Sequence, residues 1–483
     1  DEVMVQEMVQ NINMSGVVFT HDLNTGAPYY VINYDDESGL TDTVTSGSGE
    51  YSNRTIFIHR NSINKLRSER FIKLLQAVQD LEQVMNSQFL DIEFALGKDL
   101  TPYLLQVRAI TTQPNWNRSI VKHVDLELRG IEAILSRKFK PINNVYGETT
   151  IFGQMPDWNP AEMIGRAPHA LAFSLYEKLI TDHAWRIARK TMNYAVPEGQ
   201  PLMVSLAGQP FIDTRLSFHS YLPENLDPNI CNKLVNAWVQ KLKDNPELHD
   251  KIEFDIAITI YSFDIDHKIN NLVGDAISEP EKKILKKTFL NQTTALLSDQ
   301  HQGSISQALC KINFLAEKQQ IQKNSENSLD INQLFMLIDE CIHLGTIPFS
   351  ILARHGFIAK TLLLSLVQCS ILSMDHVNQI LADIRTIASD LVDDIDQLQL
   401  GELDHDAFME QYGHLRPGTY DITSPRYDQM SAFGEIEFEI RQKQEKSNYE
   451  LTLSQLKLIN QLLLSEGFTE IDSEYFLNYV KQA

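Results

Sequence analysis

The sequence predicts an α+β protein, with a β-rich first region followed by a mostly helical remainder. Up to residue 112, short apolar and β-branched runs alternate with polar turns, and one segment, 63–85, has the apolar spacing of an amphipathic helix. Beyond residue 166, apolar residues recur mostly at spacings of three and four. A chain of 483 residues is too long for one hydrophobic core. We therefore expect more than one domain.

The individual elements follow from local patterns. In the first region we predict short strands separated by turns, at 3–9, 16–20, 29–34, 55–59, 91–95 and 103–107. Residues 113–165 are rich in Pro and Gly over their second half and are predicted to be a connector. In the remainder, 166–483, we predict helices interrupted by two strand-like pieces: helices at 166–195, 230–245, 280–320, 330–400 and 450–482, strands at 202–206 and 254–261.

The amino-acid composition of the chain argues against some classes of binding partner. The net charge is -22 and the pI is about 5.0, so the surface repels nucleic acid and anionic lipid, and we expect neither as a partner. The longest apolar stretch, 361–374, is shorter than the roughly 20 residues that span a bilayer. The four cysteines have no CxxC spacing, and no signal-like segment opens the sequence. We predict a cytoplasmic protein.

Two neighbouring predicted strands carry polar residues at alternate positions. Asp91 and Glu93 share one face of their strand, and Gln106 and Arg108 share one face of the next. If the strands pair, a carboxylate, an amide oxygen and a guanidinium come together. Oxygen ligands suit Mg²⁺, and a guanidinium suits phosphate. This pattern is compatible with a nucleotide triphosphate site, but the spacing alone favours a surface hairpin whose polar residues face water.

Three ordered motifs favour the first interpretation. They are VMVQEMV at 3–9, SGVVFTHDLNTG at 15–26, and DIEFA followed by YLLQVRAI between 91 and 110. Together they resemble the nucleotide-binding domain of the pyruvate phosphate dikinase and phosphoenolpyruvate synthase family. The resemblance implies an ATP-grasp fold, of which 1–112 would be the C-terminal subdomain, with ATP and Mg²⁺ as cofactors.

The resemblance also implies roles for individual residues. Glu93 and Gln106 would hold Mg²⁺, and Arg108 would be the catalytic residue that contacts the transferred phosphoryl groups, an electrostatic task. His21 departs from the Arg that the family usually has there and is left out. The ATP-binding residues would be Gln6, Glu7, Met8, Val9, Ser15, Gly16, Thr20, Asp22, Gln106 and Arg108.

Two parts of the family's enzymes are not recognisable in this sequence. One is the N-terminal ATP-grasp subdomain with its Lys and Arg clamp, and the other is the swivelling domain whose histidine carries the phosphoryl group. None of the fourteen histidines lies in the Gly-rich Ser/Cys-His context of that domain. We therefore expect both parts in a longer protein, and we expect the present chain to bind ATP weakly or not at all.

The helical remainder is expected to bind the phosphoryl acceptor. The segment 412–427 departs from helical periodicity and offers His414, Arg416, Thr419, Asp421 and Arg426 on irregular backbone. Its sequence from Gly413 is similar to a Gly-His-Arg-Gly-Pro-Gly-Glu motif of rifampicin phosphotransferases, with Leu415 displacing the Arg and Thr419 in the Glu position. A self-capped loop held by its own Arg–Asp pairs explains the segment equally well.

A second candidate acceptor segment is 213–219. Read as extended backbone, it would place Arg215, Ser217 and His219 on one side, although the pattern alone favours a solvated strand edge. Acceptors in the wider family include pyruvate, rifamycin antibiotics and, in surface-polysaccharide pathways, the glutamine side-chain amide. We favour glutamine, because the helical motifs match neither of the other two well. A non-catalytic ATP-binding or scaffold protein derived from the family is the competing hypothesis.

Overall fold

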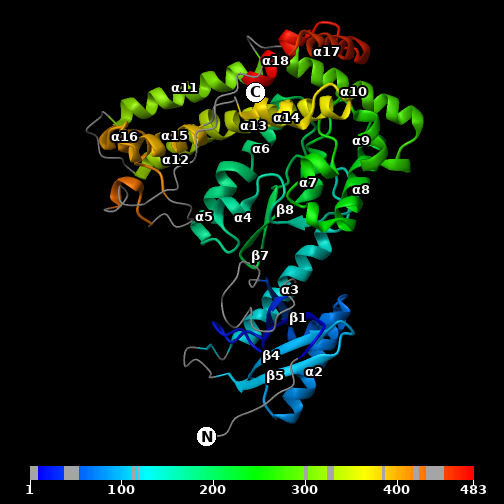
Figure 1. The fold of residues 1–483 in the computed structure, drawn as a ribbon, viewed down its shortest axis with the longest axis vertical. Coiled ribbons are helices and arrows are strands. Elements are labelled where there is room, and N and C mark those ends of the chain that lie inside the picture. Colours follow the sequence, from blue (N-terminus) through cyan, green and yellow to red (C-terminus); the bar gives the residue numbers. More distant parts are fainter. Residues whose placement is uncertain are drawn as a thin grey trace. The chain divides into compact units, whose positions relative to one another are not determined.

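The computed structural model describes residues 9–36, 54–110, 116–117, 119–298, 303–323, 331–382, 387–416, 424–430 and 451–483. The chain divides into two compact units, Asp1–Ala133 and Ile134–Ala483. Each unit has its own buried hydrophobic clusters. Figure 1 shows the sheet of the first unit in blue and cyan and the helices of the second in green to red. A mixed α+β protein is confirmed.

The first unit is built on one antiparallel sheet with the strand order β3-β2-β1-β4-β5. One long helix, α2 (Glu69–Val84), follows a short 3-10 turn, η1 (Arg60–Lys65). The strands are β1 (Ile12–Phe19), β2 (Tyr29–Asp35), β3 (Arg54–His59), β4 (Leu90–Gly97) and β5 (Pro102–Ala109).

Alternation along the strands builds the core of this unit. Val18 of β1, Ile32 of β2 and Ile92 of β4 are fully buried and pack with Leu74 and Val78 of α2. Side chains of the intervening residues therefore project from the opposite face of the sheet. That second face carries the polar positions of β4 and β5.

Most predicted elements of this unit are confirmed. The strands expected at 29–34, 55–59, 91–95 and 103–107 lie within a residue or two of those observed. The helix is shorter than expected, because 60–65 form the 3-10 turn. The strand expected at 16–20 begins at Ile12, and the strand expected at 3–9 lies almost entirely outside the described residues.

Residues 113–165 contain a long helix and a short strand that the sequence pattern does not predict. Helix α3 (Ile120–Lys138) occupies 19 residues of the expected connector, and it crosses the division between the two units. The rest is short, with the strand β6 (Phe152–Gly153) and the helix α4 (Pro160–Ile164). Asn159 caps α4 by accepting a hydrogen bond from the Glu162 backbone N–H, and Pro160 occupies the first turn.

The second unit is mostly helical, with a small antiparallel sheet of order β6-β8-β7 formed with β7 (Met203–Leu206) and β8 (Gln209–Asp213). Its helices are α5 (Ala170–Tyr176), α6 (Ala184–Thr191), α7 (Thr214–His219), α8 (Pro228–Asp244), α9 (Ile265–Leu272), α10 (Glu279–Ser298), α11 (Ser304–Lys323), α12 (Ile331–Glu340), α13 (Ile347–Gln368), α14 (Met374–Ala382), α15 (Ile387–Gln399), α16 (His405–Tyr412), α17 (Leu453–Glu466) and α18 (Ser473–Gln482). Short π-helical segments lie between some of them: η2 (Glu177–Thr181), η4 (Ile252–Ile256) and η6 (Cys341–Thr346). The short 3-10 segments are η3 (Pro246–Leu248), η5 (Gly274–Ala276) and η7 (Tyr427–Gln429).

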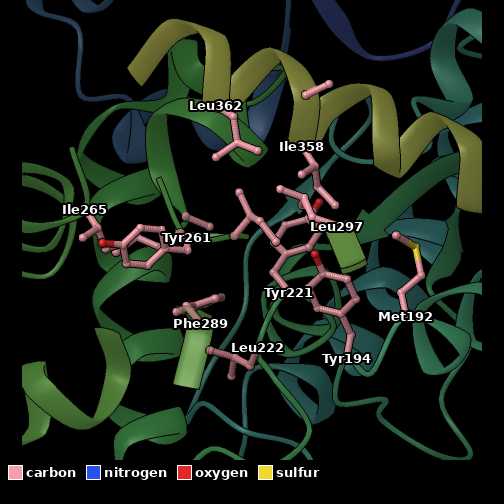
Figure 2. Packing of buried hydrophobic residues seen from close by; sticks show 14 of the residues in the cluster. Met192, Tyr194, Tyr221, Leu222, Tyr261, Ile265, Phe289, Leu297, Ile358 and Leu362 are labelled. Carbon is pink, nitrogen blue, oxygen red and sulfur yellow. The ribbon is translucent and has the colours of Figure 1, made fainter. Parts of the chain in front are cut away.

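The largest core of this unit gathers apolar side chains from helices distant in sequence. Figure 2 shows Tyr194 and Tyr221 close together in it, with Ile358 and Leu362 projecting from α13. All four are at most 1% exposed. α13 therefore acts as a central helix whose apolar length is explained by packing.

The continuous helical run 331–368, formed by α12, η6 and α13, is nonetheless long and apolar enough to cross a membrane by length and composition. Only 28% of its most apolar window is buried inside the protein. Phe335 and Met336 of α12 are exposed, whereas most of α13 is buried. This is weak evidence, because core helices of soluble proteins pass the same test.

The strand predicted at 254–261 is wrong. Its first part is the π-helical turn η4, and the residues after it form buried irregular backbone. Side chains satisfy the polar backbone groups there: the Thr259 carbonyl accepts hydrogen bonds from the Tyr194 hydroxyl at 2.9 Å and from Arg354 at 3.2 Å, and Thr293 accepts from the Tyr261 N–H. Because these groups are already paired, the segment needs no neighbouring strand.

Candidate functional site

Strands β4 and β5 bring the predicted metal and phosphate residues together. In their antiparallel register Glu93 lies opposite Gln106, and Asp91 lies opposite Arg108. Nη2 of Arg108 donates to Oε1 of Glu93 at 3.0 Å, and the same nitrogen donates to Oε1 of Gln106. The predicted pairing of the two strands and the convergence of the three side chains are confirmed.

The cluster is open to solvent. The Arg108 side chain is 57% exposed and that of Glu93 is 28% exposed. Asp91 is half-buried, and its burial raises its pKa, with the nearby Arg108 acting in the opposite direction. An exposed ion pair of this kind adds little to stability. The side chains of Glu93, Gln106 and Arg108 are therefore free to rearrange around a ligand.

The arrangement is compatible with a small cation. Oxygens of Glu93 and Gln106 both contact one nitrogen of Arg108, so they converge on one point at which a positive group already sits. Among the described residues, no cluster of three or more His, Cys, Asp or Glu side chains is placed to hold a metal ion. A metal at this position would therefore have one carboxylate and one amide from the protein, as Mg²⁺ accepts when phosphate and water complete its shell.

Two further parts of the predicted ATP site are Ser15, which lies on β1, and the residues that precede β1. Ser15 lies on the same sheet face as Glu93, since its neighbour on that face of β1, Val17, pairs with Glu93. Ser15 is nevertheless only 1% exposed. Val9 precedes β1, and the residues from Gln6 to Met8 lie outside the described part of the chain.

Gly16, Thr20 and Asp22 have structural partners. A Cβ on Gly16 would lie 2.0 Å from the Asn33 carbonyl oxygen, so the close approach of β1 and β2 explains the glycine. The buried Thr20 hydroxyl donates to the Gln88 carbonyl at 2.6 Å and accepts from the Leu90 N–H at 2.7 Å. Asp22 accepts from the Thr25 N–H within its turn. These contacts account for the three residues without a nucleotide.

In the second unit, the segment 213–219 is not extended as expected. It continues from β8 into α7, because the Thr150 hydroxyl accepts from the Arg215 N–H and the Thr214 hydroxyl donates to the Ile151 carbonyl, which fixes the start of the helix. Arg215 and His219, four residues apart, share a helix face. The acceptor interpretation assumed an exposed strand and loses that support.

Both side chains of this pair are buried. Arg215 is 0% exposed and donates from its two terminal nitrogens to the carbonyls of Lys140 and Lys138, each at 2.9 Å. Burial lowers the pKa of His219 to about 4, and its Nδ1 accepts from the Tyr146 N–H at 3.1 Å. The pair therefore ties the chain before β6 to α7.

The segment 412–427 is partly described. His414 and Arg416 are exposed, whereas Thr419 and Asp421 lie outside the described residues. Arg416 donates to the Ser424 carbonyl at 2.9 Å. Arg426 makes two hydrogen bonds to the Asp428 carboxylate, at 2.9 and 2.6 Å. These contacts match the alternative of a loop held by its own Arg–Asp pair.

Sequence reasoning missed a buried charged network in the second unit. Arg189 of α6 donates to Asp157 at 3.0 Å and to Glu253 at 3.4 Å, and Arg354 of α13 donates to the same Glu253 oxygen at 3.3 Å. Burial disfavours the charged guanidinium, but the neighbouring acids, Asp157 foremost, raise the pKa of Arg189. The four residues are scattered over 198 positions, so no local pattern marks them.

Comparisons with known proteins identify no relative of this chain. No family model, curated protein or solved structure matches the chain.

Proposed function

We propose that this chain is part of an ATP-dependent, AMP-forming phosphotransferase similar to phosphoenolpyruvate synthase. In this proposal the first unit contributes the C-terminal subdomain of an ATP-grasp nucleotide-binding domain. The N-terminal subdomain and a swivelling domain with the phosphohistidine belong to further parts of the protein. The second unit binds a small-molecule acceptor, for which we favour the glutamine side-chain amide of surface-polysaccharide biosynthesis.

The observation that carries the proposal is the convergence of Glu93, Gln106 and Arg108 on the open face of the sheet. Glu93 and Gln106 would hold Mg²⁺, which neutralises charge on the phosphate oxygens. Without nucleotide, the Arg108 guanidinium occupies the space between these two oxygens. If Glu93 and Gln106 held Mg²⁺, Arg108 would have to leave this position, and its guanidinium would then be available to a phosphoryl group.

The competing proposal, a non-catalytic ATP-binding or scaffold protein, is supported by the roles found for Thr20 and Asp22. Both use their hydrogen-bonding groups within the protein. The two proposals differ in what Arg108 does. In the enzyme it stabilises the transition state, whereas in a scaffold it belongs to a solvated surface pair worth less than about 1 kcal/mol.

The deciding experiment replaces Arg108 by Ala in the full-length protein and measures AMP release from ATP and Mg²⁺ in a coupled assay. We expect AMP formation to fall by about 10²-fold or more, the usual effect of losing a donor to a developing charge. The unfolding midpoint should stay unchanged, because the Arg108 side chain is more than half exposed.

Lys98→Ala is the matched control, since Lys98 is an exposed cation in the β4–β5 turn of the same hairpin. It should leave AMP release as in the wild type. Wild-type rates from the Arg108→Ala protein would rule out the proposed role of the cluster. No AMP formation by the intact wild-type protein with any candidate acceptor would favour the scaffold.

A further inference from the structure

The second unit contains a cavity of about 780 Å³ that none of the predicted site residues lines. It lies between the end of α3, the chain around β6 and one face of α8. Its volume falls in the range of small-molecule sites. Its apolar wall includes Leu135, Phe139, Phe152, Leu206 and Val239, and its polar lining residues are Glu148, Thr149, Thr150, Asn236, Gln240 and Lys243.

A smaller cavity of about 350 Å³ continues from the first. The two share Ile151, Phe152 and Lys243, so Lys243 stands where they meet. His249 lines the smaller one and adds a second nitrogen-bearing side chain to that end. The two cavities therefore adjoin beside β6 and are together called the groove, with Lys243 at their junction and His249 in the smaller cavity.

Lys243 differs from the neighbouring lysines of α8. Lys233 donates to Glu281 at 2.7 Å, and Lys241 donates to the Asn271 carbonyl at 3.1 Å. Within the described part of the chain, the Lys243 ammonium has no ion pair or hydrogen bond. An acidic protein with a net charge of -22 thus keeps an unpaired cation at an apolar groove, which favours a ligand with a negative group.

The other end of the larger cavity has the opposite character. Asn236 accepts from the Glu148 N–H at 2.8 Å, which places the Glu148 backbone beside the middle of α8, and the acidic residue Glu148 lines the cavity there. From Asn236 to Lys243 is seven residues, or about 10 Å along a helix. The space between is lined by apolar side chains and the Gln240 amide.

We propose that this groove binds an amphipathic organic carboxylate whose carboxylate contacts Lys243 and whose apolar body lies along α8 against Phe139 and Phe152. The body is about 10 Å long, and a hydrogen-bond donor at its far end would match Glu148. This proposal goes beyond the ATP-dependent function and holds whether or not the chain is a phosphotransferase, because no residue of the Arg108 cluster contributes to it.

The test compares two probes of one shape, phenylbutyrate and the neutral phenylbutanol, titrated calorimetrically into the 483-residue chain. We expect saturable binding, with the carboxylate about tenfold tighter than the alcohol, as for a charge-assisted contact. Lys243→Gln should reduce the carboxylate affinity about tenfold, to the level of the alcohol, and leave the alcohol unchanged. Gln240→Trp, which fills the groove from an exposed position, should weaken both probes.

Lys190→Gln is the matched control, because Lys190 is an exposed lysine of α6 outside both cavities. It should bind both probes as the wild type does, and all variants should keep the wild-type unfolding midpoint. Equal affinity of the wild type for the two probes, equal effects of Lys243→Gln and Lys190→Gln, or no saturable binding of either probe would each overturn the proposal.

Discussion

Thr20 shows how a residue in a nucleotide-like motif can be explained by the fold. Its hydroxyl joins the end of β1 to the chain entering β4, donating to the Gln88 carbonyl and accepting from the Leu90 N–H. Both partners belong to the backbone, and Thr20 is 0% exposed. The motif at 15–26 therefore carries folding information whether or not it also serves ATP.

We predict that Thr20→Val, which keeps the shape and removes the hydroxyl, lowers the free energy of unfolding of the first unit by about 1–3 kcal/mol. The reason is that the buried Leu90 N–H then lacks a partner. Thr20→Ser keeps the hydroxyl and should cost less. Denaturant unfolding of the three proteins measures the difference, and equal losses for Val and Ser would show that the hydroxyl is not what matters.

At the scale of elements, prediction succeeded where the pattern was local. The hairpin of β4 and β5 follows from alternation around a Gly97-Lys98-Asp99 turn, so the cluster around Arg108 could be anticipated. The segment 254–261 has the same apolar alternation but forms no strand, because side chains distant in sequence, those of Tyr194, Thr293 and Arg354, pair with its backbone. Such tertiary partners have no local signal.

The same limit applies to the sites. The groove along α8 uses Asn236, Gln240 and Lys243, whose spacing of four and three residues marks one helix face in the sequence. What the sequence cannot give is that Phe139 and Phe152 lie opposite this face. The buried partners of Arg189 are likewise set by packing alone.

The pairing of β1 with β2 offers a test of an element as a whole. A Cβ at Gly16 would lie 2.0 Å from the Asn33 oxygen and 2.8 Å from the Tyr34 Cα, both backbone atoms, so the strands would have to separate. We predict that Gly16→Ala lowers the free energy of unfolding of the first unit by about 2 kcal/mol or more.

Gly130→Ala is the control for this substitution. Gly130 lies in α3, and an added Cβ would meet nothing within 4 Å. That change should stabilise the helix by up to about 1 kcal/mol. The two substitutions should therefore change the free energy of unfolding in opposite directions, as measured by urea unfolding followed by circular dichroism. If Gly16→Ala left the free energy of unfolding unchanged, β1 and β2 would not be held in this register.

Each of the two units has a core of its own, and the second combines apolar packing with buried polar groups. His355 of α13 is fully buried, with Ser304 at 2.7 Å from its Nε2 and the Tyr479 hydroxyl at 2.8 Å from its Nδ1. Burial lowers its pKa to about 4, and the charge of Arg354 acts in the same direction. Together with His219, whose pKa burial also lowers to about 4, it makes the stability of this unit depend on pH.

The sign of this dependence follows from proton uptake. In the unfolded chain a histidine has a pKa of about 6.5, so above that pH both states are neutral and the full stability is present. As the pH falls from about 6.5 towards about 4, the unfolded state binds protons that the folded state cannot, and each histidine lowers the free energy of unfolding by up to about 1.4 kcal/mol per pH unit. We therefore predict that the second unit becomes progressively less stable as the pH falls from about 7 to about 5.

Guanidinium unfolding at a series of pH values, followed by the fluorescence of the buried Trp185 and Trp238, measures how steeply the stability changes with pH. His355→Gln should make the slope smaller, whereas the exposed His267→Gln should not, and an identical slope in all three proteins would contradict a neutral, buried His355.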